Sequence, residues 1–213
     1  LTFNYTVAAG HTSLDLDYVA TTSLALNSGT IKDAALNAGT LTLPAIGAAG
    51  SLAVNKDIEI DTTSPTVAIT TTTGVSDGST TSDATINLTF TTSESTTDFV
   101  VGDITPGNGT LTDFTGSGTS YTATFTPNGQ GACTIDVAGN TFTDGASNNN
   151  AAAAQFNWTF DNVAPTVISV TSPKADRSYK AETLIPITVT FSEVVNVTGT
   201  PQITLETGSS DAV

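Results

Sequence analysis

The 213-residue sequence lacks methionine and has one cysteine, one histidine and five basic residues. The single cysteine, Cys133, cannot form an internal disulfide, so we expect it to be a small buried hydrophobe. One histidine leaves almost no ligands for a zinc site or a histidine-based catalytic triad. Five basic against twenty acidic side chains give a net charge of −15, which repels phosphate and argues against nucleic-acid binding.

Long apolar runs are also missing. None approaches the roughly 18 residues that a membrane-spanning helix needs, and no charged-then-apolar signal opens the chain. The first residue is Leu1 rather than methionine, from which we expect an internal piece of a longer polypeptide. Its length suffices for one large domain or two ordinary ones.

Threonine makes up about a fifth of the residues, whereas helix-forming residues are sparse. Threonine is β-branched and suits a half-buried pleated surface, so the composition favours an all-β protein. Apolar residues alternate with polar ones along many short segments, and Gly, Asn, Pro and Asp separate these segments. The pattern predicts a β-sandwich or barrel with no helix, and it predicts a loop at the Ala-rich run 151–154. The apolar members of the expected strands are Leu1, Phe3, Tyr5, Val7; Ile86, Leu88, Phe90; Tyr121, Ala123, Phe125; Cys133, Ile135, Val137; Phe156, Trp158, Phe160; and Ile185, Ile187, Val189, Phe191.

An internal repeat sets the domain organisation. DTTSPTV at 61–67 returns as DNVAPTV at 161–167, one hundred positions later. INLTFTTSE at 86–94 returns without gaps as IPITVTFSE at 185–193. The C-terminal segment therefore repeats the first half of the middle segment.

The N-terminal segment repeats the second half of the middle one. TVAAGHTSLDL at 6–16 resembles TPNGQGACTIDV at 126–137, and DIEID at 57–61 falls where NWTFD falls at 157–161.

These relations predict one complete repeat at 62–161. They also predict the C-terminal half of a repeat at 1–61 and, at 162–213, the N-terminal half of a further repeat of the same type as 1–61. Half a sandwich would expose its core, so something must complete each half. Either the chain comes from a longer array of alternating units, or neighbouring copies complete it by strand donation.

The segments DTTSPTV, FSE, VGDITPGNG and SGTSYTATFTP, with the D-x-x-x-N loop before the last strand, resemble bacterial Ig-like repeats of large surface adhesins and biofilm proteins. The flanking halves resemble a cadherin-like variety found in the same proteins. The resemblance implies tandem Ig-like Greek-key β-sandwich domains arranged as an extended rod. It also implies an extracellular location, on the bacterial surface or secreted, and calcium at the domain junctions.

Calcium is the one ligand that the residues support chemically, because Ca²⁺ takes six to eight oxygens and needs no histidine or cysteine. Candidate ligand oxygens recur at equivalent positions of the repeats. In an Ig-like domain these positions can all lie at the same end of the sandwich. An acid in a turn is more often a cap or a solvated side chain, and the strongest calcium-loop motifs are absent. The candidates are the linker acids Asp61 and Asp161, the loop pairs Asp33/Asn37 and Asp144/Asn148, the strand-end acids Glu94 and Glu193, and, with less support, Asp103.

No residue pattern indicates an enzyme. His11 lies in an expected surface turn, and Asp15 and Asp17 alternate with leucines on the outer face of one expected strand. Ser117 stands between two glycines but lacks the helix that a nucleophile elbow requires.

The sequence therefore predicts spacer or stalk repeats of a large bacterial adhesin or extracellular fibre, rigidified by calcium. The expected partners are adjacent repeats, of the same or neighbouring chains, with any host or matrix ligand bound elsewhere in the parent protein. Two alternatives remain: a self-assembling filament subunit completed by neighbouring copies, and a glycan- or receptor-binding module, which clustered exposed aromatics would favour.

Overall fold

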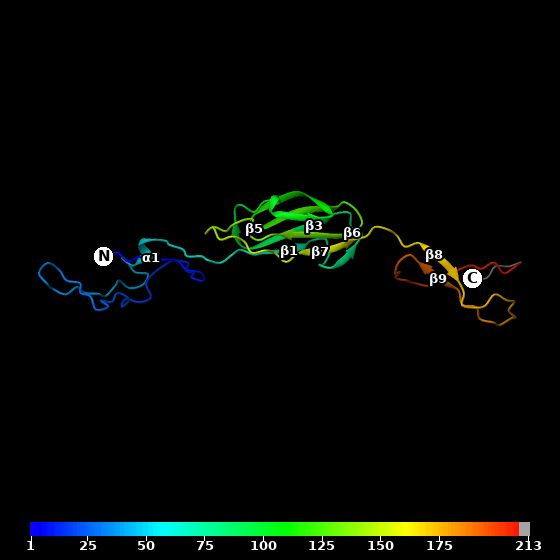
Figure 1. Ribbon diagram of the computed structural model, residues 1–213, viewed down its shortest axis with the longest axis horizontal. Helices are drawn as coiled ribbons and strands as arrows, with labels where there is room; N and C mark the ends of the chain where they lie inside the picture. Colours follow the sequence, from blue (N-terminus) through cyan, green and yellow to red (C-terminus); the bar gives the residue numbers. More distant parts are fainter. Residues whose placement is uncertain (209–213) are drawn as a thin grey trace. The chain divides into compact units, whose positions relative to one another are not determined.

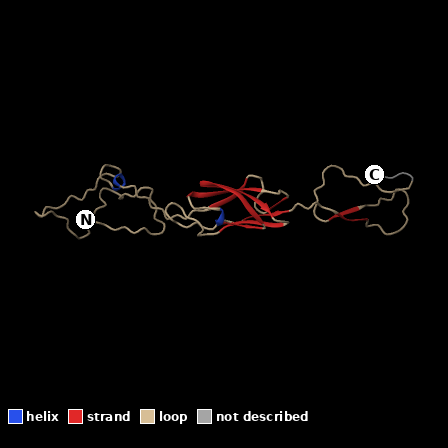
Figure 2. Ribbon diagram, turned by 90° about the horizontal axis from the view of Figure 1, so that it is seen from above, coloured by secondary structure: helices blue, strands red, loops and turns tan. Residues whose placement is uncertain are grey.

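The computed structural model describes residues 1–208, and the chain divides into two compact units, Leu1–Asp161 and Asn162–Val213. Strands dominate the regular structure and gather in the central part of the sequence, drawn in red in Figure 2. In residues 1–208 no helix is long and apolar enough to cross a membrane. The helical elements are α1 (Leu52–Asn55) and a 3₁₀ turn, η1 (Val101–Asp103).

The central strands form two sheets that close a sandwich (Figure 1). In the first sheet, β3 lies between β1 and β5 and pairs antiparallel with both. Ile86 stands opposite Phe125, Leu88 opposite Ala123 and Phe90 opposite Tyr121, so the apolar members of β3 and β5 share one face. The bounds are β1 (Val67–Thr71), β3 (Ile86–Thr96) and β5 (Gly109–Pro127).

The second sheet has the strand order β2-β7-β6-β4. β7 pairs antiparallel with β6 and parallel with β2, where Ser79 is opposite Trp158. The bounds are β2 (Ser79–Thr81), β4 (Ile104–Gly107), β6 (Gly131–Val137) and β7 (Phe156–Phe160).

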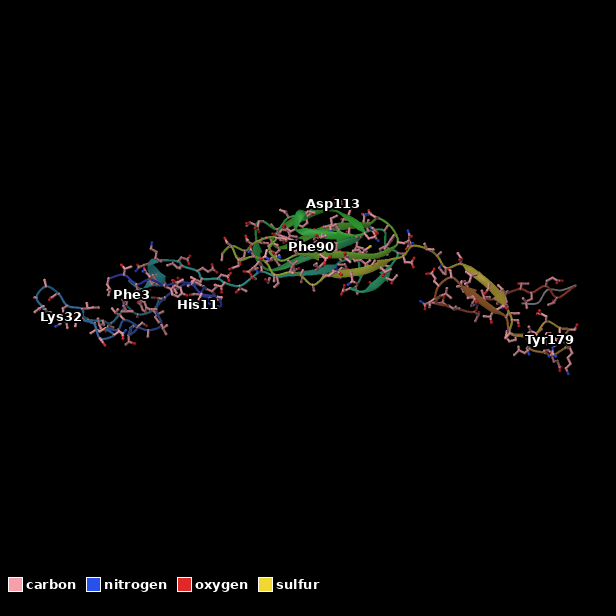
Figure 3. The ribbon with its side chains drawn as sticks, viewed as in Figure 1. Phe3, His11, Lys32, Phe90, Asp113 and Tyr179 are labelled. Carbon is pink, nitrogen blue, oxygen red and sulfur yellow. The ribbon has the colours of Figure 1, made fainter. Side chains whose placement is uncertain are left out.

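The core lies between these two sheets and confirms the expected alternation in the middle repeat. Phe90, labelled in Figure 3, and Phe125 are fully buried. Trp158 packs edge-on against Phe125, with ring centroids 4.7 Å apart. Cys133 is free and fully buried, as expected, and residues 151–154 form a loop. The other predicted members of this core are also buried: Ile86, Leu88, Tyr121, Ala123, Ile135, Val137, Phe156 and Phe160.

The prediction of strands in residues 1–61 is wrong for this chain. This segment contains only isolated bridges, Ser13 with Ile60 and Lys32 with Ala38. The expected absence of helix is also wrong, because α1 forms after Ser51, whose Oγ accepts a hydrogen bond from the Val54 N–H. A strand needs a continuous neighbour for its backbone groups, and within residues 1–61 the pairing is limited to these single bridges.

In its described residues, 162–208, the second unit contains one antiparallel pair, β8 (Val167–Thr171) with β9 (Thr188–Phe191). These strands occupy the repeat positions of β1 and β3. The strand expected from Ile185 begins only at Thr188, and both strands are almost wholly exposed.

Replacing Gly109 tests the packing of the sandwich. A Cβ at Gly109 would overlap the ring of Phe125, which is fully buried. We expect Gly109→Ala to lower the free energy of unfolding by roughly 1–3 kcal/mol through overpacking. Urea denaturation followed by Trp158 fluorescence measures the change. The matched control is Gly129→Ala, where no atom lies within 4 Å of the added Cβ, and an equal loss there would contradict the packing account.

Candidate metal centre

Asp144 opens the loop before β7 and is almost fully buried. Its Oδ1 accepts the backbone N–H groups of Ala146 and Asn148, both at 2.8 Å, and its Oδ2 accepts Asn148 Nδ2 at 2.9 Å. An aspartate that bonds the backbone two residues on forms an Asx turn. Ser147 completes the turn in the left-handed region, with φ 69°. The local sequence thus holds Asp144 rigidly.

Asp61 belongs to the linker that enters the sandwich, and the loop of Asp144 holds it in place. Asn148 Nδ2 donates to the Asp61 carbonyl oxygen at 3.1 Å, and the Asp61 Oδ1 accepts the Thr63 N–H at 2.8 Å. Asn148 therefore acts as a hydrogen-bond donor that joins the loop to the linker.

Glu94 comes from the last part of β3 and is half-buried. Potential ligand oxygens of Glu94, Asp61 and Asp144 all lie within 4.8 Å of one another. The structure thus brings together three acids that lie far apart in the sequence. We call these three residues the carboxylate trio.

The carboxylate trio carries an electrostatic cost. Burial raises the pKa of Glu94, and the negative charges of Asp61 and Asp144 raise it further. A hydrogen bond with the Asp61 side chain also favours the protonated form of Glu94. A cation between the three groups would remove this repulsion.

Asp61 and Glu94 line an open hollow of about 300 Å³, together with Glu59 and with Gly145, the residue that follows Asp144. That space accommodates a cation and the waters that complete its shell, and carboxylates are the ligands that Ca²⁺ prefers. Glu59 is not among the ligands predicted from the sequence. The signal was present, because Asp57, Glu59 and Asp61 alternate in DIEID and so share one face of an extended segment.

The other predicted ligands lie elsewhere. Asp33 and Asn37 repeat the hydrogen bonds of Asp144 and Asn148, and the bond from Asn37 lowers the pKa of Asp33, but this loop is exposed and outside the trio. Asp103 Oδ2 instead accepts a hydrogen bond from the Val100 N–H at 2.8 Å and so caps the start of η1.

Asp161 and Glu193 belong to the two different units. Asp161 ends the first unit, where its N–H donates to the Thr81 carbonyl at 2.9 Å. Glu193 follows β9 and is exposed. Among residues 1–208, the carboxylate trio is the only group of three such side chains with ligand atoms this close together.

Residues 61–160 match a family model described as a bacterial Ig-like domain, and the matched segment coincides with the two-sheet sandwich. Residues 61–160 form a bacterial Ig-like domain. Domains of this family are typically not enzymes. Comparison of the chain with curated proteins and with solved structures gives no significant match. The carboxylate trio lies where the Ig-like domain begins, since Asp61 is its first residue.

Asn148→Ala tests the link between the loop and the linker. The change removes the amide donor to Asp144 and Asp61, so we expect the Ig-like domain to lose about 1–2 kcal/mol of unfolding free energy. Urea denaturation followed by Trp158 fluorescence measures the loss. Asn37→Ala is the matched control, because it breaks the same local turn in the exposed loop. An equal loss of unfolding free energy in Asn37→Ala would contradict the link between the loop and the linker.

The pH dependence of the metal-free protein tests the repulsion in the trio. The folded state raises the pKa of Glu94 from its ordinary value of 4.5. Protonation of Glu94 therefore stabilises the folded state fully below pH 4.5, and this stabilisation is lost as pH rises through the raised pKa. Glu94→Gln stays neutral, so its melting temperature should exceed that of the unchanged chain near pH 7 and equal it near pH 4. Thermal melts with EGTA across this range measure the difference. An equal gain in Glu193→Gln, an exposed strand-end acid, would contradict the account.

Proposed function

We propose that this chain is a spacer segment of a large bacterial cell-surface adhesin or extracellular fibre, and that Ca²⁺ in the carboxylate trio rigidifies the start of its Ig-like domain. The observation that carries the proposal is the convergence of Asp61, Glu94 and Asp144 where the linker enters the sandwich. The three acids come from the linker, from β3 and from the loop before β7. One cation would therefore tie three separate parts of the chain together.

The linker contacts support a mechanical role. Ile60 and Ser13 exchange backbone hydrogen bonds of 2.8 Å in both directions, and Leu16 N–H donates to the Ile58 carbonyl. Thr62 Oγ accepts the Gly10 N–H at 3.0 Å and donates to the His11 carbonyl at 3.1 Å. The N-terminal segment is thus hydrogen-bonded to residues directly beside Asp61. Fixing Asp61 with a cation would remove conformational freedom from this joint.

The surface charge fits an extracellular spacer. A net charge of −15 with few basic residues keeps such a chain solvated and suppresses self-association of its polar faces. The antiparallel pairing of β3 with β1 and β5 supplies the backbone hydrogen bonds that resist extension. No chemistry beyond cation binding is needed for this role.

Thermal melts of the chain with calcium and with excess EGTA test the proposal. Calcium that binds only the folded state stabilises it by mass action, by about 2.7 kcal/mol at a hundredfold excess over Kd. We expect the melting temperature to rise by several degrees with calcium, and we expect Glu94→Gln and Asp61→Ala to abolish the rise.

Asp113→Asn is the matched control, because Asp113, labelled in Figure 3, is an exposed acid of β5 that does not belong to the trio. Its calcium response should equal that of the unchanged chain. Identical melting temperatures with calcium and with EGTA, or a full calcium-dependent rise in Glu94→Gln, would contradict calcium binding at this site.

A further inference from the structure

The Ig-like domain contains two Asn-Gly pairs, Asn108-Gly109 and Asn128-Gly129, and the rest of the sequence has none. An asparagine before a glycine is open to attack by its own backbone, because glycine has no Cβ to block the approach of its nitrogen to the side-chain amide. The two pairs are alike in the sequence. Their surroundings in the fold differ, and this difference decides which pair can react.

The reaction is an intramolecular acyl transfer. The backbone nitrogen of the glycine attacks the side-chain carbonyl carbon of the asparagine and forms a new C–N bond. The side-chain nitrogen takes the proton of the glycine N–H and leaves as ammonia, so the chain is left with a succinimide ring. Water then opens the ring at either carbonyl, which gives aspartate or isoaspartate. The reaction needs no oxidant, metal or second protein.

Ring closure depends on freedom in the chain. The asparagine side chain must turn toward the following peptide nitrogen, and the backbone between the two residues must rotate to bring the reacting atoms into line. A misplacement of about 1 Å can slow a reaction by about a hundredfold, so a backbone fixed in another geometry protects its asparagine.

Asn108 is fixed on both sides of the reacting bond. Its Nδ2 donates a hydrogen bond to the Gly129 carbonyl at 2.9 Å, and its own carbonyl accepts one from the Asn128 N–H at 3.0 Å. Gly109 begins β5 against the fully buried ring of Phe125, which a Cβ at Gly109 would overlap. Rotation of this peptide would therefore displace a core side chain.

Asn128 and Gly129 lie between β5 and β6, in a loop that starts after Pro127 and ends before Gly131. Both residues are exposed, and within residues 1–208 the Asn128 side chain has no hydrogen-bond partner. No atom lies within 4 Å of a Cβ placed on Gly129. The loop thus leaves both the side chain and the glycine backbone free to reach the geometry of ring closure.

Two Asp-Gly pairs could form the same ring with loss of water, but hydrogen bonds hold both aspartates. Asp77 Oδ1 accepts the N–H of Asn157 at 2.7 Å and its Nδ2 at 3.0 Å. Asp144 is held by the turn that it opens and is almost fully buried. A carboxylate is also a poorer acceptor for a nucleophile than an amide. Neither pair competes with Asn128-Gly129.

We propose that Asn128 is a site of spontaneous modification, which converts through a succinimide with Gly129 into aspartate or isoaspartate, while the folded Ig-like domain keeps Asn108 intact. The inference rests on the Ig-like fold and is independent of the calcium proposal.

The modified loop lies at the end of the sandwich away from the carboxylate trio. Phe125, just before the loop, is opposite Ile86 at the start of β3, whereas Glu94 of the trio lies near the end of β3. Either product adds a negative charge at this end. Isoaspartate also inserts a methylene group into the backbone, which shifts the Gly129 carbonyl that Asn108 Nδ2 contacts. We therefore expect the isoaspartate form to melt at a lower temperature than the aspartate form.

Timed incubation of the full chain in mildly alkaline buffer with EGTA, followed by digestion and mass spectrometry, tests the inference. Chymotrypsin cuts after aromatic residues, and Phe114, Tyr121 and Phe125 separate the two asparagines into different peptides. We expect the peptide with Asn128 to gain the mass difference between an acid and an amide, and to become a substrate of isoaspartate methyltransferase. The peptide with Asn108 should stay unchanged. A sample digested at zero time gives the background.

Gly129→Ala tests the role of the glycine. The added methyl group obstructs ring closure, so conversion of Asn128 should slow by roughly tenfold or more. Gly145→Ala is the matched control, because it adds the same group to another glycine whose Cβ would meet no atom within 4 Å. It should leave the rate at Asn128 unchanged. Equal rates at Asn128 in Gly129→Ala and in the unchanged chain would overturn the mechanism.

Incubation in urea tests the role of the fold. Unfolding releases Asn108 from its hydrogen bond and Gly109 from Phe125, so both asparagines should then convert at similar rates. Loss of Trp158 fluorescence change on return from urea is not needed, because the peptides are read directly. Equal conversion of Asn108 and Asn128 in the folded chain, or an Asn128 that stays intact in the folded chain, would overturn the inference.

Discussion

The apolar face of a β-sheet must be covered by a second sheet, and this constraint governs every part of the chain. In the Ig-like domain, the alternating apolar residues of β3 and β5 meet those of β6 and β7, and Phe90, Phe125 and Trp158 are buried together. Within residues 1–208, the same alternation in the flanking segments meets no second sheet, and Phe3 and Val189 are exposed. The difference lies in the partner and not in the strand sequence.

The carboxylate trio depends on the same closure. Glu94 is placed by the pairing of β3, and Asp144 by the loop between β6 and β7. Only a closed sandwich brings these two elements to one end, where Asn148 then secures Asp61. The junction therefore combines two effects of opposite sign: hydrogen bonds that hold the linker and a carboxylate repulsion that raises the pKa of Glu94.

The sequence predicted much of the Ig-like domain, because alternation shows which side chains face inward and the repeat shows which segments are equivalent. It also grouped Asp61, Glu94 and Asp144 at one pole, where the structure places them; their binding of calcium stays a prediction. Periodicity does not show whether a strand has a neighbour, so the strands expected in residues 1–61 were wrong and α1 was missed.

Local sequence also fails to show where a turn will lie. Asp33 and Asp144 open turns with the same hydrogen bonds, yet only Asp144 reaches the trio. The repeat did not indicate Glu59, because its counterpart in the Ig-like domain is Thr159, which is not an acid. Which turn reaches the trio follows from the packing of elements that are distant in the sequence, and one sequence does not specify that packing.

Titration calorimetry of the metal-free chain with Ca²⁺ tests the central claim most directly, because it counts bound ions without reference to stability. The account predicts binding at the carboxylate trio that disappears in Glu94→Gln and persists in Asp113→Asn. Absence of binding, or equal binding by the Glu94→Gln chain, would contradict it. The junction would then be held by the hydrogen bonds of Asn148 and Thr62 without a cation.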